Sequence, residues 1–279
     1  YVNLFVFVFM IGACLSQGRA QTKSAVSYKN PVVDIAMPDP TVIKATDGYF
    51  YVYATESTRN VPIMKSKDLV EWTYCNTAFT NKTRPRFEPK AGIWAPDINY
   101  INGKYVLYYA MSVWGGEQTC GIGVATADSP QGPFTDHGKM FRSNEIGVQN
   151  SIDPSFLQYE GRNYLVWGSF RGIYVIELTE DGLSLKPGAE KKRIAGTAFE
   201  AAYIHKHGDY YYMFASIGSC CRGVESTYKV VVGRSKKVWG PYKDKSGKPM
   251  LKNGYSLVIG ANDYFVGNGH GSQMIRDDA

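Results

Sequence analysis

Residues 47–55 read DGYFYVYAT, and the same pattern returns as NGKYVLYYAMS at 102–112, GRNYLVWGS at 161–169 and GDYYYMFAS at 208–216. Each copy opens with a turn that contains glycine and continues as an aromatic and β-branched run that favours a strand. The copies recur at intervals of roughly fifty residues, which is typical of four-stranded propeller blades. The repeat therefore predicts an all-β propeller.

The residues around each copy complete the expected blade. A short acid-containing strand precedes the copy, a β-branched strand such as IYVIEL at 173–178 follows it, and an outer element closes the unit. The outer elements are expected at 69–72, 129–136 and 237–244. A fifth unit begins at Gly267, and its turn is due where Asp277 stands. We expect a five-bladed β-propeller over residues 30–279 with its fifth blade truncated at the C-terminus.

Composition agrees with a strand-rich fold and argues against a nucleic-acid partner. The 279 residues include 21 Tyr, 13 Phe, 5 Trp and 29 Gly, which supply strands and tight turns. The net charge of +6 comes from scattered basic residues, without a run that would form a nucleic-acid groove. A mildly basic surface suits an acidic polysaccharide matrix, although solvated Lys and Arg explain the charge equally well. We expect a monomer.

The N-terminal segment indicates export. Residues 4–15 form an apolar run, LFVFVFMIGACL, that is too short to span a bilayer. Small residues at Gly18 and Ala20 suit cleavage before Gln21, so we expect a signal peptide over residues 1–20 that is incomplete at its start. A bacterial lipoprotein box ending at Cys14, which would attach the protein to a membrane, is one alternative, and a buried strand is another. Both main readings predict a secreted, periplasmic or lipid-anchored protein.

The remaining cysteines are Cys75, Cys120, Cys220 and Cys221. They contain no CxxC spacing, so a zinc site is not expected. The adjacent pair at 220 and 221 has two possible states. One is a strained vicinal disulfide, and the other, which we favour, is two reduced thiols on opposite faces of a strand.

Three acidic boxes precede three of the repeats: Pro38-Asp39-Pro40, Ile152-Asp153-Pro154 and Phe199-Glu200-Ala201. Equivalent strands of a propeller converge on one central cavity, so the three carboxyls are expected to meet there. Hydrolysis of a glycosidic bond needs a base, an acid and a charge that tunes the acid. A single Asp before Pro is common at strand starts, and only the joint pattern favours catalysis. Asp97, in a fourth such box, is interpreted as structural.

The ordered motifs DPTVI, WAPDI, NSIDPSF, FEAAYI, SCCRGVESTY and GHGSQ make the chain resemble glycoside hydrolase family 43, in its α-1,5-L-arabinan hydrolase branch. The resemblance implies a five-bladed propeller with an inverting mechanism. It places Asp39 on the general base, Glu200 on the general acid and Asp153 on the residue that orients and tunes the acid. An inverting enzyme holds its two carboxyls about 6.5 to 9.5 Å apart to admit a water. The family often has Gly-Pro after the acid, where this chain has two alanines.

Other residues are expected to support the site. The resemblance implies that His270 helps to hold a metal ion, usually calcium, mostly through water, because calcium prefers oxygen ligands. A satisfied structural histidine is the alternative. Trp94 and Trp114 are candidates for stacking on sugar rings, against buried core tryptophans. Asn150 and Ser169 are candidates for hydrogen bonds to sugar hydroxyls.

The predicted function is that of an exported, inverting arabinan endo-1,5-α-L-arabinosidase that needs no organic cofactor. Its substrate would be arabinan or another plant cell-wall polysaccharide. An exo-acting α-L-arabinofuranosidase or a β-xylosidase of the same family is the first alternative. A non-catalytic glycan-binding propeller is the second, and it would not need carboxyls in opposed protonation states.

Overall fold

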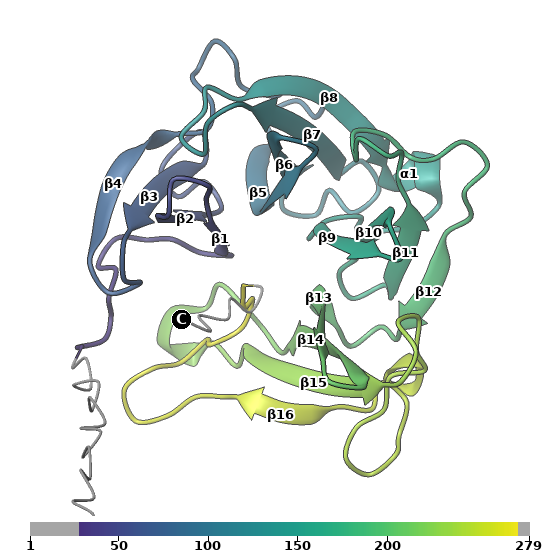
Figure 1. The fold of residues 1–279 in the computed structure, drawn as a ribbon. Coiled ribbons are helices and arrows are strands. Elements are labelled where there is room, and N and C mark those ends of the chain that lie inside the picture. Colours follow the sequence, from purple (N-terminus) through teal and green to yellow (C-terminus); the bar gives the residue numbers. More distant parts are fainter. Residues whose placement is uncertain (1–27, 273–279) are drawn as a thin grey trace, which may run out of the picture.

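The computed structural model describes residues 28–272, which form a ring of four antiparallel sheets around a central axis (Figure 1). This confirms an all-β propeller. The predictions for the signal peptide at 1–20, for Cys14 and for the end of the fifth blade at 273–279 lie outside the described residues. No helix within residues 28–272 is long and apolar enough to cross a membrane.

Each sheet is one blade whose four strands follow chain order from the axis outward. The first two blades comprise β1 (Thr41–Lys44), β2 (Phe50–Tyr53), β3 (Pro62–Ser66) and β4 (Trp72–Thr77), then β5 (Gly92–Ile101), β6 (Lys104–Ser112), β7 (Gly121–Ala127) and β8 (Thr135–Arg142). The next two comprise β9 (Ser155–Tyr159), β10 (Arg162–Trp167), β11 (Ile173–Glu177) and β12 (Lys192–Ala195), then β13 (Glu200–His207), β14 (Tyr210–Ile217), β15 (Lys229–Ser235) and β16 (Ser256–Ile259). The short helical turns are α1 (Ser143–Ile146), η1 (Gly223–Glu225) and η2 (Met250–Lys252).

The four aromatic copies of the repeat became β2, β6, β10 and β14, as predicted. These strands are largely apolar because the blades pack face to face, and eight of the nine residues of β6, in a blade that lies between two others, are buried. Aromatic contacts join neighbouring blades, for example Phe141 of β8 with Trp167 of β10, whose ring centroids are 5.2 Å apart. Burial of large aromatic surfaces between blades therefore holds the ring together.

One outer strand was predicted in the wrong place. The expected outer element at 237–244 is mostly a turn, which pairs with β15 through an isolated bridge between Arg234 and Lys243, and β16 forms the outer strand. Pro241 has no N–H to donate to a ladder. Tyr242 is fully buried, and its hydroxyl donates a hydrogen bond to the Val238 carbonyl, so this segment folds inward and packs against the core. In the second blade, β8 likewise starts at Thr135 and not at residue 129.

The inner strands share a backbone irregularity where they reach the axis. Asp39, Ala95, Asp153 and Ala201 have left-handed φ values of 51°, 42°, 57° and 51°. In blades two and four this residue interrupts the ladder, with register shifts between Trp94 and Asp97 and between Glu200 and Tyr203. Non-glycine residues rarely adopt this conformation, and such strain tends to gather at functional sites.

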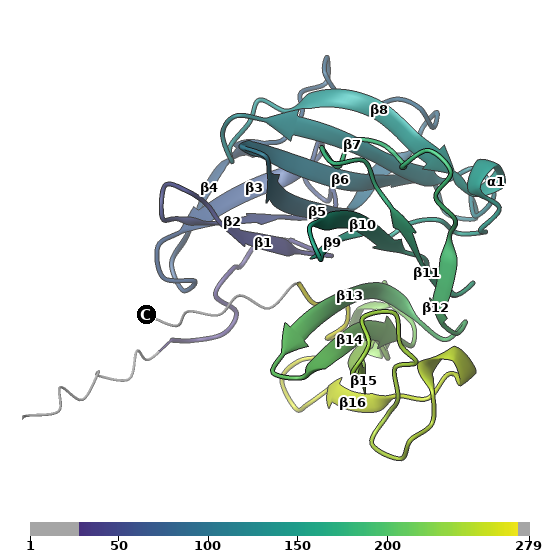
Figure 2. The same ribbon diagram turned by 45° about the vertical axis from the view of Figure 1, so that its right-hand side comes forward.

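His270 repeats this conformation with a φ of 49°. Its segment lies between the first and fourth blades: Val42 N–H donates to Ser272 Oγ at 3.0 Å, and His270 N–H donates to Ser216 Oγ at 2.7 Å. Lys229 and Asn268 form a parallel bridge on the same side. Both views place β1, β5, β9 and β13 nearest the axis, and residues near 270 return to it between β1 and β13 (Figures 1 and 2).

Candidate active site

A pocket of about 460 Å³ lies where the inner strands begin. Its walls include every site residue that the sequence predicted: Asp39, Trp94, Trp114, Asn150, Asp153, Ser169, Glu200 and His270. These residues come from all four blades and from the segment after β16. The fold therefore brings together positions that are more than 200 residues apart in the chain.

Asp39 is held as an anion on one side of the pocket. Thr55 Oγ1 donates to Asp39 Oδ2 at 2.6 Å, and His270 Nδ1 lies 3.1 Å from Oδ1. Burial raises the pKa of Asp39, but the charge of His270 and the hydrogen bonds from His270 and Thr55 outweigh it, so the pKa is lowered overall. Burial alone would lower the pKa of His270, yet the surrounding carboxylates raise it to about 9. The pair is thus a carboxylate with a protonated imidazole at neutral pH.

Thr55 is a site residue that sequence reasoning missed. Its hydroxyl accepts the Ala95 N–H at 2.7 Å, which directs its own hydrogen to Asp39. Thr55 is the last residue of the first aromatic repeat, DGYFYVYAT, and the sequence therefore shows that it belongs to the same blade as Asp39. Its orientation toward that carboxyl depends on how β2 meets β5.

Asp153 and Glu200 are buried carboxyls, with exposed fractions of 6% and 7%. Asp153 Oδ2 accepts the Ala201 N–H at 3.0 Å, which ties it to the residue beside Glu200. Burial raises the pKa of Asp153; the charge of His270 opposes this, and repulsion from Glu200 and Asp39 adds to it. Burial likewise raises the pKa of Glu200, against hydrogen bonds from Ser169 and Tyr228. This pair therefore retains a proton to higher pH than an ordinary carboxyl does.

Tyr228 is a second residue that the prediction omitted, although it closes the motif SCCRGVESTY. Its phenol is buried and bonds to the Glu200 carboxyl, and burial together with this neighbour raises the pKa of Tyr228. Tyr228 is therefore a neutral donor to Glu200 at neutral pH.

The two tryptophans form an aromatic wall. Their ring centroids are 5.5 Å apart with the planes at 50°, and Trp114 is 77% exposed while Trp94 is half-buried. An exposed ring of this size at the edge of a pocket offers an apolar face to a ligand. The alternative of a buried core residue does not describe Trp114.

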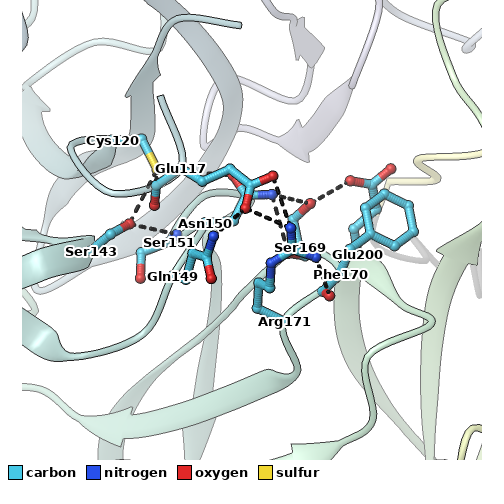
Figure 3. A network of polar contacts seen from close by, with 10 residues as sticks. All are labelled: Glu117, Cys120, Ser143, Gln149, Asn150, Ser151, Ser169, Phe170, Arg171 and Glu200. Atoms are coloured by element: carbon cyan, nitrogen blue, oxygen red, sulfur yellow. Dashed lines mark hydrogen bonds and ion pairs between the residues drawn. The ribbon is translucent and has the colours of Figure 1, made fainter. Parts of the chain in front are cut away.

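Asn150 and Ser169 lie beside Glu200, and their side chains form hydrogen bonds with other groups of the protein. Ser169 Oγ donates to Glu200 Oε2 at 2.7 Å, and Asn150 Nδ2 donates to Ser169 Oγ at 2.9 Å (Figure 3). Asp97 is structural, as expected: its Oδ2 accepts the Phe156 N–H of the next blade at 2.7 Å. It therefore links the second blade to the third.

Cys220 and Cys221 line the pocket, but the strand expected for them is absent from this part of the described chain. They lie in the loop after β14, with the left-handed φ of 61° at Cys221, and their sulfur atoms are 2.8 Å apart. The interpretation that the side chains point to opposite faces of a strand was wrong. Both are free thiols, as are Cys75 and Cys120.

His270 also lines a small axial cavity of about 30 Å³ beneath the pocket. Residues 28–272 contain no group of three or more His, Cys, Asp and Glu side chains placed to hold a metal. One imidazole, whose Nδ1 already contacts Asp39, does not make the oxygen-rich shell that calcium prefers. These residues fit an ion only if water supplies most of its ligands, and the metal stays a prediction.

One carboxyl with a lowered pKa and two carboxyls with raised pKa values lie in the central pocket of a propeller, and this combination is typical of a glycosidase. Residues 28–279 match the family described as glycosyl hydrolases family 43. The chain belongs to this family, which confirms the resemblance noted in the sequence.

Relatives of known activity are similar over most of their length. The extracellular endo-α-(1→5)-L-arabinanase 1 of Bacillus subtilis (strain 168) is 39% identical over 245 residues, covering 83% of this chain and 75% of that enzyme. The extracellular exo-α-(1→5)-L-arabinofuranosidase ArbA of Cellvibrio japonicus (strain Ueda107) is 36% identical over 267 residues, covering 86% and 75%. The structure of Cellvibrio cellulosa α-L-arabinanase complexed with arabinohexaose matches with a TM-score of 0.79 at 34% identity, covering 87% and 84%.

Proposed function

We propose that this protein is an inverting arabinan endo-1,5-α-L-arabinosidase. The observation that carries the proposal is the presence, in one pocket, of Asp39 with a lowered pKa and Glu200 with a raised one. Two titratable groups whose environments push their pKa values apart are the usual mark of a base and an acid. Each carboxyl also has its own hydrogen-bond donors, so the two are positioned separately.

In this mechanism Asp39 accepts a proton from a water molecule, which attacks the anomeric carbon. Glu200 gives its proton to the departing glycosidic oxygen, and the configuration inverts because attack and departure take place on opposite faces. Asp153 acts through Glu200: charge on one of these two buried carboxyls disfavours charge on the other, so that the pair retains a proton, and the bond of Asp153 to Ala201 N–H holds the backbone beside the acid.

The substrate assignment rests on the aromatic wall and on the relatives. Trp94 and Trp114 offer apolar faces on which a furanose can pack. Relatives that share a third or more of their residues are named for α-1,5-linked arabinan, and a solved relative holds arabinohexaose. We therefore propose linear α-1,5-arabinan as the substrate.

Endo action is tested by the products that form from debranched linear α-1,5-arabinan. Chromatography of early time points should show a ladder of arabino-oligosaccharides, because an endo enzyme cleaves internal bonds. Release of a single short product from the first time points would favour exo action, the second candidate. That candidate is supported by the 36% identity to an exo-α-(1→5)-L-arabinofuranosidase.

Activity should follow a bell-shaped pH profile. The acidic limb reports Asp39, whose lowered pKa keeps it ionised below the usual range of aspartate. The alkaline limb reports loss of the proton held by Glu200 and Asp153, whose raised pKa values move it toward neutral pH. Measuring kcat/KM from about pH 3 to about pH 9 checks both limbs. An alkaline limb near the ordinary glutamate pKa of about 4.3 would contradict the assignment of the acid.

Three further parts of the proposal concern the whole protein. A fifth blade would complete the ring, since His270 repeats the backbone conformation of the other four inner strands. Export is supported by the two relatives named extracellular.

A water-rich cation, with calcium as the first choice, would lie in the axial cavity beside His270. It would add positive charge beneath the carboxyls and stabilise their ionised forms.

A further inference from the structure

We propose that Asn150 and Ser169 form a donor relay that orients the general acid and selects which oxygen of Glu200 carries its proton. This inference rests on the role of Glu200 proposed above, and it gives Asn150 and Ser169 a task other than binding sugar hydroxyls. Both would be positioning residues that act through Glu200. Figure 3 shows the side chains in sequence from Asn150 through Ser169 to Glu200.

The direction of the relay follows from the bond partners. Asn150 Nδ2 lies 3.1 Å from the Ser169 backbone carbonyl and 2.9 Å from Ser169 Oγ. A carbonyl only accepts, so this contact requires the NH₂ group of Asn150, and not its oxygen, to face Ser169. The Ser169 hydroxyl therefore accepts from Asn150 and donates to Glu200 Oε2 at 2.7 Å.

This arrangement has a consequence for the acidic proton. Because Oε2 receives the Ser169 hydrogen, a proton placed on Oε2 would compete with that bond. Protonation on Oε1 leaves the bond intact. The relay thereby holds the carboxyl in one rotamer and reserves Oε1 for transfer to the leaving oxygen.

The backbone holds the relay more firmly than the ion pair at its edge. Asn150 has a left-handed φ of 57°, and its N–H donates to the Glu117 carbonyl at 2.7 Å. Glu117 also pairs with Arg171 at 2.7 Å, but these side chains are 34% and 43% exposed. Exposed ion pairs contribute little, whereas Ser169 is only 1% exposed. The buried hydrogen bonds are therefore the effective restraint.

Other groups also face Glu200 and influence its titration. They are the carboxylates of Asp39 and Asp153, the imidazole of His270, the phenol of Tyr228 and the thiol of Cys220. Ser169 is the neutral donor that the substitution below removes, while these groups stay unchanged. A shift of the alkaline limb in that variant is thus attributable to the relay.

The test compares Ser169→Ala with Ser151→Ala in the otherwise unchanged protein. Ser151 is a matched control in the same network, because it is fully buried and its hydroxyl bonds to Trp167 and to the Val148 carbonyl rather than to Glu200. For Ser169→Ala we expect kcat/KM on linear α-1,5-arabinan to fall about 10- to 100-fold, the range for losing a hydrogen bond to a charged group. The alkaline limb should move upward by about 1 pH unit, because the lost donor stabilised ionised Glu200.

Two further measurements separate orientation from simple damage. An aryl glycoside of α-1,5-arabinobiose with a good leaving group needs little protonation, so Ser169→Ala should cleave it at nearly the wild-type rate. If Ser169→Ala does not fold, Asn150→Ala serves in its place, since it removes the donor to Ser169 without adding a charge. Asn150→Ala should likewise lose more activity on arabinan than on the aryl glycoside.

The relay is wrong if the limb stays in place, if both substrates lose activity equally, or if Ser151→Ala gives the same shift. Glu200→Gln separates these failures from failure of the proposed function. If the Glu200→Gln enzyme kept full activity on arabinan, Glu200 would not be the general acid, and the relay would have no role. A Glu200→Gln enzyme that is inactive on arabinan, beside an unaltered Ser169→Ala enzyme, would refute the relay alone.

Discussion

Asp39→Asn is expected to lower kcat on linear α-1,5-arabinan about 100- to 10,000-fold, the range for removing a general base. Asparagine has the same shape and can still accept the hydroxyl hydrogen of Thr55, which bonds to Asp39 at 2.6 Å in the native protein. What it cannot do is take a proton from water. The loss should therefore be equally large for arabinan and for an aryl glycoside, since both reactions need an activated water.

A chemical rescue distinguishes a lost base from a damaged fold. Asp39→Ala leaves space beside His270 and Thr55, and azide can act there as a nucleophile that needs no deprotonation. Adding azide should restore turnover and yield a glycosyl azide of inverted configuration, detected by NMR. An unchanged thermal unfolding midpoint is the control for folding. If azide rescued Glu200→Ala and not Asp39→Ala, Glu200 would be the general base and Asp39 the general acid.

Glu200→Gln should produce a loss of similar size on arabinan, about 100- to 10,000-fold, but with a different dependence on the leaving group. The amide of glutamine can accept the Ser169 hydrogen, so the buried network is retained. It has no acidic proton to give to a departing sugar hydroxyl. An activated phenol leaves without protonation, so hydrolysis of an aryl glycoside should be reduced far less than hydrolysis of arabinan.

Matched measurements on the two substrates check this expectation. The ratio of their kcat/KM values should change in Glu200→Gln and stay constant in Asp39→Asn. The alkaline limb of the pH profile should also disappear in Glu200→Gln, because the titrating acid is gone. Equal losses on both substrates, with the alkaline limb in place, would mean that Glu200 binds substrate and does not protonate the leaving oxygen.

The blades could be read from the sequence because local chemistry specifies them. A run such as NGKYVLYYAMS carries its own turn and strand propensities, and it is buried on both faces wherever blades pack together. The outer strand of the fourth blade could not be read in this way. The segment at 237–244 has strand-like residues, but its Tyr242 packs in the core, and β16 pairs with β15 as the outer strand.

The sequence predicted the acids of the candidate site, but it did not predict Thr55 and Tyr228 or the exact position of each acid on its inner strand. The four acids seemed equivalent in the repeat, yet their positions on the inner strands differ. Asp39 and Asp153 are themselves the left-handed residues, whereas Glu200 precedes such a residue and Asp97 comes two positions after one. The repeat does not distinguish these backbone positions, because each box shows only that an acid lies near the start of a strand.

The spacing of the repeats was sufficient to predict the repeated blade, because each blade is built from contacts within about fifty residues, and closing such blades into a ring places the acid before each inner strand near one axis. The family resemblance added the expected roles of these acids. Only the folded chain decided that Thr55 and His270 hold Asp39, and that Asn150, Ser169 and Tyr228 surround Glu200. The contacts of His270 with Asp39 and of Ser169 with Glu200 join segments that lie far apart in the chain or in different blades, and no local pattern encodes their distances and burial.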